Sequence, residues 1–230
     1  MNLTIDIGNT RVKWGLFDGD RLVEKGGGLP LPKADSTVYC ATGEMPADLR
    51  QALPEEVLDF RQSTAGYRHL PIAIDYATPQ TLGPDRVAAA CGAWKITGGK
   101  PCVIIDAGTC ITIDYLDATG TYRGGAILPG ILMKFRALHT FTAKLPLLEM
   151  RSEEEEADIP ATGRTTEESM RAGVVTATRF SIAGFVDYYR QKEPDVVVVV
   201  TGGDAERIAV EGMRVEPDLV MVGMNEWVNA

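Results

Sequence analysis

The chain contains the same unit twice, about one hundred residues apart. The first copy reads LTIDIGNTRVKWGLF from Leu3, and the second reads VIIDAGTCITIDYL from Val103. In both copies an apolar run ends in Asp, one further residue and Gly, and a hydroxyl or amide residue then precedes a second apolar run. Two apolar runs joined by a tight turn are typical of a β-hairpin. The repeat therefore predicts a duplicated α/β fold, whose two turns face each other across a cleft.

Further strands and helices are expected after each hairpin. In the first half, Pro54 is expected to limit the first helix. The predicted strands are 3–7, 11–17, 21–26, 36–42 and 71–76, and the predicted helices are 47–57 and 86–97. The run Gly98-Gly99-Lys100-Pro101 then breaks the chain. We therefore predict two domains, residues 1–100 and residues 101–230.

The second half shows a comparable alternation of elements. The segment 101–116 predicts two strands, and the β-branched run 195–202 predicts a fully buried strand. Helices are predicted at 131–142, 167–192 and 205–212, a Gly-rich bend at 124–130, and a solvated acidic segment at 151–160.

Charge and composition exclude several classes of function. The net charge of −9 argues against a nucleic-acid partner, because binding to phosphate backbones needs an excess of Lys and Arg. No apolar run reaches the roughly 18–20 residues that span a bilayer, and no signal peptide is visible, so no membrane partner is expected. The four cysteines have no CxxC spacing, and both His residues stand alone. These features predict a cytoplasmic protein with reduced thiols and no zinc site.

The repeated turns have a definite chemical capacity. A tight turn with Gly and a hydroxyl or amide residue presents several backbone N–H groups in one direction, which suits phosphate oxygens. The Asp before each turn offers a carboxylate to a cation that bridges phosphates. One such turn could be an ordinary hairpin, but a matched pair, with a third Gly-rich turn at Gly202-Gly203-Asp204, favours a nucleotide site. Neither GxxxxGK[ST] nor GxGxxG occurs, so P-loop and dinucleotide folds are not indicated.

Four further stretches make the pattern specific. They are YATPQTLGPDR from Tyr76, GGAILPG from Gly124, GRTTEESMRAGV from Gly163 and PDLVMVGM from Pro217. In this order they resemble the type III pantothenate kinases of the actin/hexokinase/heat-shock ATPase superfamily. The resemblance implies duplicated RNase H-like (actin-like ATPase) domains, with mixed sheets flanked by helices. It also implies an enzyme that transfers the ATP γ-phosphate to the primary hydroxyl of pantothenate, giving 4'-phosphopantothenate in the first step of coenzyme A biosynthesis.

The resemblance assigns nucleotide and cation roles to residues of both turns. Thr109 would add a hydroxyl to the phosphate site, and Asp106 would hold a monovalent cation, potassium or ammonium. The carboxylate of Asp6 would face the Mg²⁺ that accompanies ATP. The ATP phosphates would be cradled by Asp6, Ile7, Gly8, Asn9, Thr10, Arg11, Val12 and Lys13.

Substrate roles are implied in the same way. Asp85 would be the general base, and Tyr76 would line the pantothenate pocket together with Gly83, Pro84, Asp85 and Arg86. Thr166 would reach pantothenate from the neighbouring subunit of a homodimer with a shared active site. The family more often has Asn where this chain has Thr165, so the choice between Thr165 and Thr166 is open, with spacing favouring Thr166.

The same residues have less specific explanations. Asp85 could be an acidic residue at a helix N-terminus with no catalytic role, and Arg86 could form a surface salt bridge. The helix N-terminus and the adjacent Arg86 predict a lowered pKa for Asp85. Two other functions remain open. A sugar or acetate kinase would need a longer chain, and a non-catalytic nucleotide-binding regulatory relative would be expected to lack the Asp85–Arg86 pair.

Overall fold

The computed structural model describes residues 1–65, 69–152 and 158–230. Much of the predicted acidic segment, residues 153–157, lies outside this part of the chain. Two compact units are present, and they do not follow chain order. The first comprises Met1–Cys102, Asp114–Gly124 and Asp218–Ala230, and the second comprises Val103–Ile113 and Gly125–Pro217. The division into domains at residue 100 stays a prediction.

The first unit is built on a five-stranded sheet of order β3-β2-β1-β4-β5. The central strand β1 pairs antiparallel with β2, which places Asp6 opposite Lys13, and it pairs parallel with β4. The carboxyl ends of β1 and β4 therefore meet at one edge of the sheet, where the first turn lies. The strands are β1 (Asn2–Ile7), β2 (Val12–Asp18), β3 (Arg21–Gly26), β4 (Ser36–Ala41) and β5 (Leu58–Asp59).

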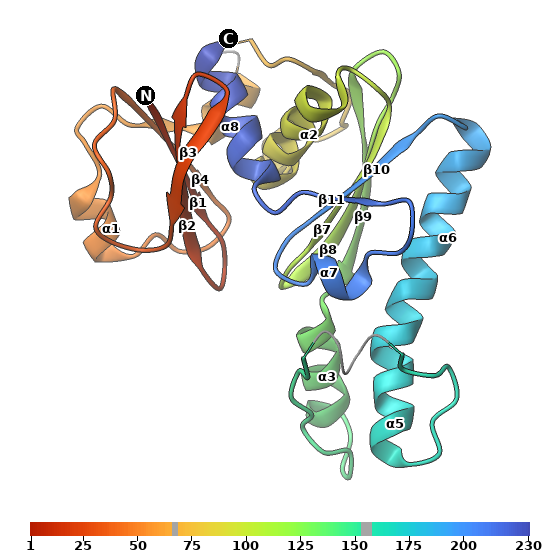
Figure 1. Cartoon of the computed structure of the whole chain (residues 1–230). Coiled ribbons are helices and arrows are strands. Elements are labelled where there is room, and N and C mark those ends of the chain that lie inside the picture. The colour runs from red at the N-terminus through yellow and green to blue at the C-terminus, as the bar shows by residue number, and fades with distance from the viewer. Residues whose placement is uncertain (66–68, 153–157) are drawn as a thin grey trace. The chain divides into compact units, whose positions relative to one another are not determined.

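Two long helices pack beside this sheet. Figure 1 shows α2 (Pro84–Thr97) and α8 (Leu219–Asn229) side by side, and α8 contacts β1. A Cβ at Gly92 or Gly223 would collide with the backbone of the opposite helix, so glycine at these two positions permits the close approach. The unit also contains α1 (Ala47–Ala52), η1 (Phe60–Ala65), β6 (Ala73–Ile74) and η2 (Pro79–Thr81).

A second sheet has six strands in the order β11-β10-β7-β8-β9-β6. Read from β9, it repeats the first sheet: β9-β8-β7-β10-β11 corresponds to β3-β2-β1-β4-β5, and β10–β11 is parallel like β4–β5. The predicted duplication in an α/β fold with mixed sheets is therefore confirmed. The further strands are β7 (Cys102–Ala107), β8 (Cys110–Leu116), β9 (Thr121–Pro129), β10 (Val197–Thr201) and β11 (Arg214–Val215).

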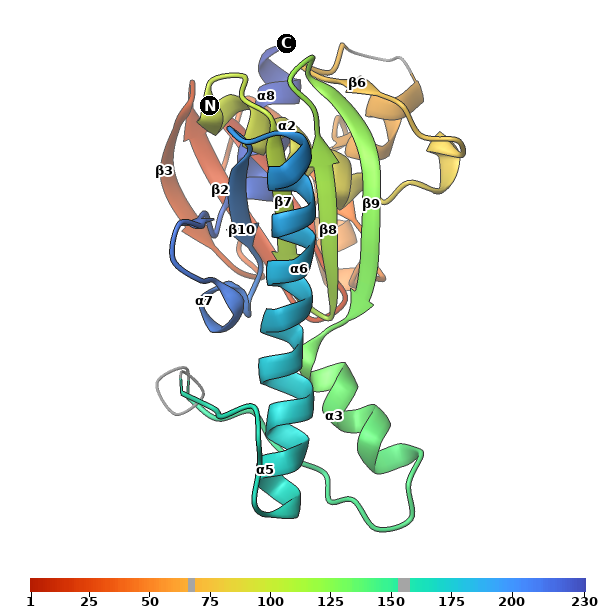
Figure 2. The same cartoon turned by 90° about the vertical axis from the view of Figure 1, so that its right-hand side faces the viewer.

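The helix predicted at 167–192 is present as one continuous helical rod with an irregular centre. It consists of α5 (Thr166–Arg171), a π-helical turn η3 (Ala172–Thr176) and α6 (Ala177–Lys192). Figure 2 shows α3 (Ile131–Thr140) beside the N-terminal part of this rod, where it contacts η3. Among the helices of the described ranges, none is long and apolar enough to span a bilayer.

Four predictions from the sequence need correction. The helix predicted at 47–57 ends at Ala52, because Leu53 is extended. The bend predicted at 124–130 is wrong, because Gly124–Pro129 continue strand β9. Gly124 has φ +83°, and a Cβ there would lie 3.3 Å from the ring of Tyr76, so glycine allows the strand to pass close to this aromatic neighbour. The strand predicted at 71–76 is reduced to β6. The helix predicted at 205–212 ends after one turn, as α7 (Ala205–Ile208), because Ala209 is extended.

Candidate active site

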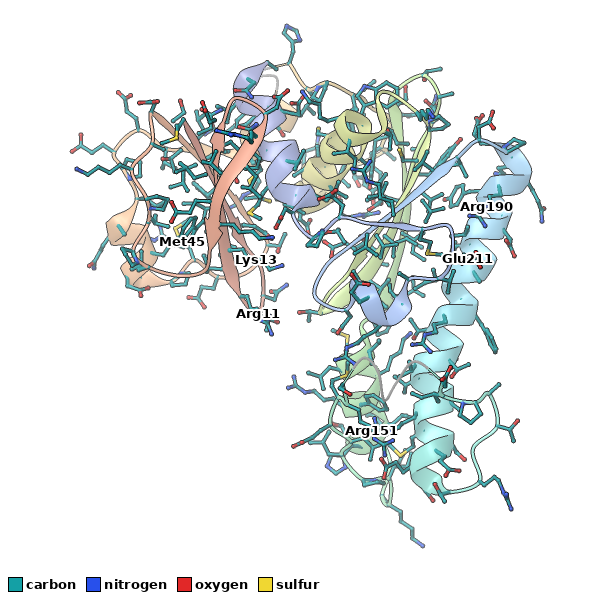
Figure 3. All side chains as sticks on the ribbon, viewed as in Figure 1. Arg11, Lys13, Met45, Arg151, Arg190 and Glu211 are labelled. Atoms are coloured by element: carbon teal, nitrogen blue, oxygen red, sulfur yellow. The ribbon has the colours of Figure 1, made fainter. Side chains whose placement is uncertain are left out.

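The first repeated turn closes the β1–β2 hairpin. The amide of Gly8 donates to the carbonyl oxygen of Arg11 at 3.0 Å, which fixes a tight loop between the strands. Arg11 and Lys13 lie at this end of the hairpin (Figure 3). All eight residues predicted to contact ATP phosphates, Asp6 to Lys13, are therefore on one hairpin with its backbone turned at Gly8.

Gly43, which sequence reasoning missed, supports this turn from β4. The amides of Thr42 and Gly43 donate to the carbonyl oxygen of Ile7 at 3.0 and 3.1 Å. A Cβ at Gly43 would lie 2.6 Å from the carbonyl oxygen of Gly8, so the two backbones touch. The signal was present in the sequence, because a Thr-Gly pair stands at the end of both strands: Thr42-Gly43 directly after β4, and Thr201-Gly202 where β10 ends.

The second turn is supported in the same way within the second unit. The amide of Gly108 donates to the carbonyl oxygen of Cys110 at 2.9 Å. The amide of Asp204 donates to the carbonyl oxygen of Ala107, also at 2.9 Å. A Cβ at Gly202 would lie 2.5 Å from Oδ1 of Asp106. The third Gly-rich turn thus packs directly on the carboxylate that was predicted to bind a cation. Thr109 is exposed at the tip of this turn.

Asp6 has an unusual electrostatic environment. Burial raises its pKa to about 6, the charge of Lys13 opposes this rise, and the charge of Asp85 adds to it. The two carboxylates therefore interact, although Asp6 ends a strand and Asp85 begins a helix. A group of three or more His, Cys, Asp or Glu side chains that could hold a metal ion is absent from the described residues.

Asp85 lies in the first turn of α2, where Gly83 is the N-cap. Its Oδ1 accepts a hydrogen bond from the amide of Arg86 at 2.8 Å, and a Cβ at Gly83 would lie 2.6 Å from this oxygen. Burial raises the pKa of Asp85, and the charge of Asp114 adds to the rise. The predicted lowering is wrong, because burial outweighs the hydrogen bond and charge of Arg86.

Arg86 is buried, and its guanidinium faces Asp114. Nε and Nη2 lie 3.1 and 2.5 Å from Oδ1 of Asp114, and the two side chains are 6% and 1% exposed. Tyr122 donates from its hydroxyl to the same oxygen at 2.7 Å, and its ring centroid lies 6.3 Å from that of Tyr76. Sequence reasoning missed Asp114 and Tyr122. The signal was a carboxylate inside a buried apolar strand, which needs a partner.

Thr165 and Thr166 have different roles at the start of α5. The hydroxyl of Thr165 accepts the amide of Glu168 at 3.1 Å, and the Glu168 carboxylate accepts the amide of Thr165 in return. This capping box satisfies two amides of the first helical turn. Thr166 is the first residue of the helix and is exposed. The Thr165 hydroxyl therefore has a structural role in the helix cap, whichever of the two threonines contacts a ligand.

Solved structures with the same fold agree with this architecture. A Baf family transcriptional activator from Campylobacter jejuni has a TM-score of 0.63 and 21% identity, covering 99% of this chain and 97% of that chain. Component A of the (R)-2-hydroxyglutaryl-CoA dehydratase from Acidaminococcus fermentans has a TM-score of 0.51 and 16% identity, covering 98% and 95%. At these identities the likeness concerns the fold alone.

Sequence relatives identify the family. Residues 56–188 match a family model described as type III pantothenate kinase. A type III pantothenate kinase of Bacteroides fragilis is 36% identical over 250 residues, covering 100% of this chain and 98% of the relative. That of Cytophaga hutchinsonii is 34% identical, with 100% and 99% covered, and that of Phocaeicola vulgatus is 35% identical, with 89% and 86% covered. The chain belongs to the type III pantothenate kinase family.

Proposed function

We propose that this protein is an ATP-dependent pantothenate kinase. It transfers the γ-phosphate to the primary hydroxyl of pantothenate and gives 4'-phosphopantothenate, the first step of coenzyme A biosynthesis. Beside family membership, the observation that carries the proposal is the start of α2. There, Asp85 has a half-buried carboxylate with a raised pKa. The amide of Arg86 donates a hydrogen bond to this carboxylate, and Gly83 has no Cβ that would collide with it.

The chemistry needs positioning, charge neutralisation and a proton acceptor. Asp85 orients the attacking hydroxyl and accepts its proton, and the raised pKa makes it a stronger base than a solvated aspartate. Backbone amides of the hairpin turn hold phosphate oxygens, with Lys13 supplying a positive charge. In the second unit, we assign Thr109 to phosphate binding. Gly83, Pro84, Arg86 and Tyr76 line the pantothenate side.

Two kinds of cation fit the residues present. Mg²⁺ arrives with ATP and supplies neutralisation of phosphate charge; the interacting carboxylates of Asp6 and Asp85 would accommodate a divalent ion near them. The Asp106 carboxylate would hold a monovalent cation, potassium or ammonium. Its Oδ1 lies against the Gly202 backbone, and a carboxylate oxygen is a ligand that suits a hard cation.

The proposal includes a homodimer with a shared active site, in which Thr166 contacts pantothenate bound to the partner subunit. The second unit exposes large apolar side chains that a partner could cover. These are Ile127 (64% exposed), Phe141 (85%), Leu147 (53%) and Phe180 (64%). The four cysteines are free thiols, which accords with the proposed cytoplasmic location.

A non-catalytic regulatory relative is the second candidate, and the presence of half-buried Asp85 beside buried Arg86 argues against it. Ligand binding alone gives no reason to hold a carboxylate with a raised pKa beside the substrate residues.

The test is an ADP-release assay with ATP, Mg²⁺ and pantothenate, in potassium and in sodium salts. We expect pantothenate-dependent turnover that is faster in potassium. Asp85→Asn should lower kcat at least about 100-fold, the scale of general-base catalysis. The matched control is Asp117→Asn, which removes another carboxylate of the first unit, paired on the surface with Arg123. No pantothenate-dependent ADP release by the wild-type enzyme in any salt would refute the kinase function.

A further inference from the structure

The Asp114 carboxylate is the meeting point of donors from two other elements. From α2, Arg86 contributes Nε and Nη2, at 3.1 and 2.5 Å from Oδ1. From β9, Tyr122 donates its hydroxyl at 2.7 Å, and its side chain is fully buried. Asp114 itself is 1% exposed in the middle of β8. Three strictly buried polar groups are thus joined at one oxygen.

This arrangement decides which part of the Arg86 guanidinium can meet a ligand. The edge formed by Nε and Nη2 faces Asp114, so only the opposite side of the fork is available to a substrate. The Tyr76 side chain also acts on the charge of this guanidinium, so the two side chains lie close together. The ring of Tyr76 is itself placed against Gly124, which has no Cβ to displace it. Asp114, Arg86 and Tyr76 therefore form one chain of contacts.

We propose that Asp114, held by Tyr122, is a positioning residue of the pantothenate site: it fixes the guanidinium of Arg86 beside Tyr76. This inference rests on the proposed function, because Arg86 and Tyr76 are substrate residues only if pantothenate is the substrate.

A purely stabilising role accounts less well for the same contacts. A buried ion pair contributes little net stability, because desolvation of both charges offsets their attraction, and apolar residues of similar volume often serve as well. An ion pair does specify geometry, since Arg and carboxylate bind in a fixed fork. The charge of Asp114 also raises the pKa of Asp85, which links the pair to the proposed base.

The first experiment is Tyr122→Phe, which removes one hydrogen bond to Asp114 and keeps the ring. We expect the KM for pantothenate to rise about tenfold, equivalent to the loss of one hydrogen bond to a charged group. kcat and the KM for ATP should stay within about twofold. The matched control is Tyr39→Phe, because the Tyr39 hydroxyl donates to Asp59 at 3.0 Å in the same unit, away from the proposed substrate residues. It should leave all three constants unchanged.

The second experiment compares the kinetic constants of Asp114→Asn with those of the wild-type enzyme. The neutral amide no longer forms an ion pair with the Arg86 guanidinium, so the KM for pantothenate should rise while the KM for ATP stays within about twofold. A general loss of packing would instead change both KM values together with Tm. If this variant does not fold, the Tyr122→Phe result decides alone.

The outcomes separate the two proposals. A wild-type enzyme without pantothenate-dependent turnover refutes the kinase function. An active wild-type enzyme, with an unchanged KM for pantothenate in Tyr122→Phe, refutes the positioning role of Asp114 and leaves the kinase function intact.

Discussion

The carboxyl group of Asp6 is buried, and burial disfavours its charged form. Its pKa in the folded protein is about 6, against 3.8 for a free aspartate. The folded state therefore binds a proton more tightly than the unfolded chain, so stability falls as pH rises through the window from 3.8 to about 6 and stays lower above it. The difference corresponds to about 3 kcal/mol.

Asp6→Asn should therefore stabilise the unliganded protein at pH 8, raising Tm by roughly 6–12 °C for a chain of this size. At pH 4 the gain should nearly vanish, because Asp6 is then protonated in the folded state. Thermal unfolding at both pH values measures this. An equal Tm difference at pH 4 and pH 8 would show that burial does not govern Asp6. The same variant should lose affinity for Mg²⁺–ATP.

The pKa of Asp85 could not be predicted from the local sequence. A helix N-terminus and an adjacent arginine predict a lowered pKa, and both features are present. The pKa is raised because the carboxyl is buried and Asp114, twenty-eight residues from Arg86, takes the guanidinium. The neighbouring residues in the chain predict a helix N-terminus with an arginine beside Asp85. The pKa of Asp85 also depends on Asp114 of β8, which lies near only in the folded protein.

Gly43 and Gly202 each bring a neighbouring strand end into contact with one of the two repeated turns. Gly43→Ala would force a Cβ against the Gly8 carbonyl at the centre of the phosphate hairpin. We expect a loss of about 1–3 kcal/mol in the free energy of unfolding, the cost of overpacking, and a raised KM for ATP. Gly184→Ala is the control, because Gly184 lies in α6, outside the proposed nucleotide site, and a Cβ there meets nothing within 4 Å. If Gly43→Ala has the kinetics and stability of this control, the hairpin does not depend on Gly43.

The cap of α5 separates two adjacent threonines experimentally. Thr165→Ala should cost about 1 kcal/mol of stability by loss of the capping box, with kinetic constants nearly unchanged. Thr166→Val should leave Tm unchanged and raise the KM for pantothenate. Unfolding curves and kinetics of both variants test this pair. The reverse pattern, with the kinetic effect at Thr165, would assign the substrate contact to Thr165.

Elements with strong local signals were predictable, and those set by distant partners were not. The hairpins, α2 and the 167–192 helix follow from apolar periodicity and turn residues. The segment 124–130 has the composition of a bend, yet it forms β9. Strand β9 pairs with β6 at Thr121 and Tyr122, just before this segment, and β6 lies about fifty residues away in the chain. Local composition cannot report such a partner.

At the level of the whole molecule, the duplication could be predicted from the sequence, but the return of the C-terminal helix to the first unit could not. The repeated Asp-x-Gly turns predicted two copies of one strand order, which the sheets show. The return of Asp218–Ala230 to the first unit rests on Gly92 and Gly223, which let α2 and α8 touch. Neither glycine has a local turn signal, since both lie inside helices.

The proposed active site shared between two subunits makes a quantitative prediction for mixed dimers. Asp85→Asn and Thr166→Val each damage both sites of a homodimer, but in a heterodimer one site keeps both residues. Random pairing makes about half of the dimers heterodimers, and one of the two sites in each heterodimer is intact. About a quarter of all sites are therefore intact, so the co-expressed variants should recover about a quarter of wild-type turnover at low pantothenate. The control is Asp85→Asn co-expressed with Arg86→Ala, which should recover nothing because both changes lie in the same half of the site. If the first mixture never exceeds the sum of its homodimers, Thr166 does not serve the partner subunit, and each chain would have to supply its own pantothenate contacts.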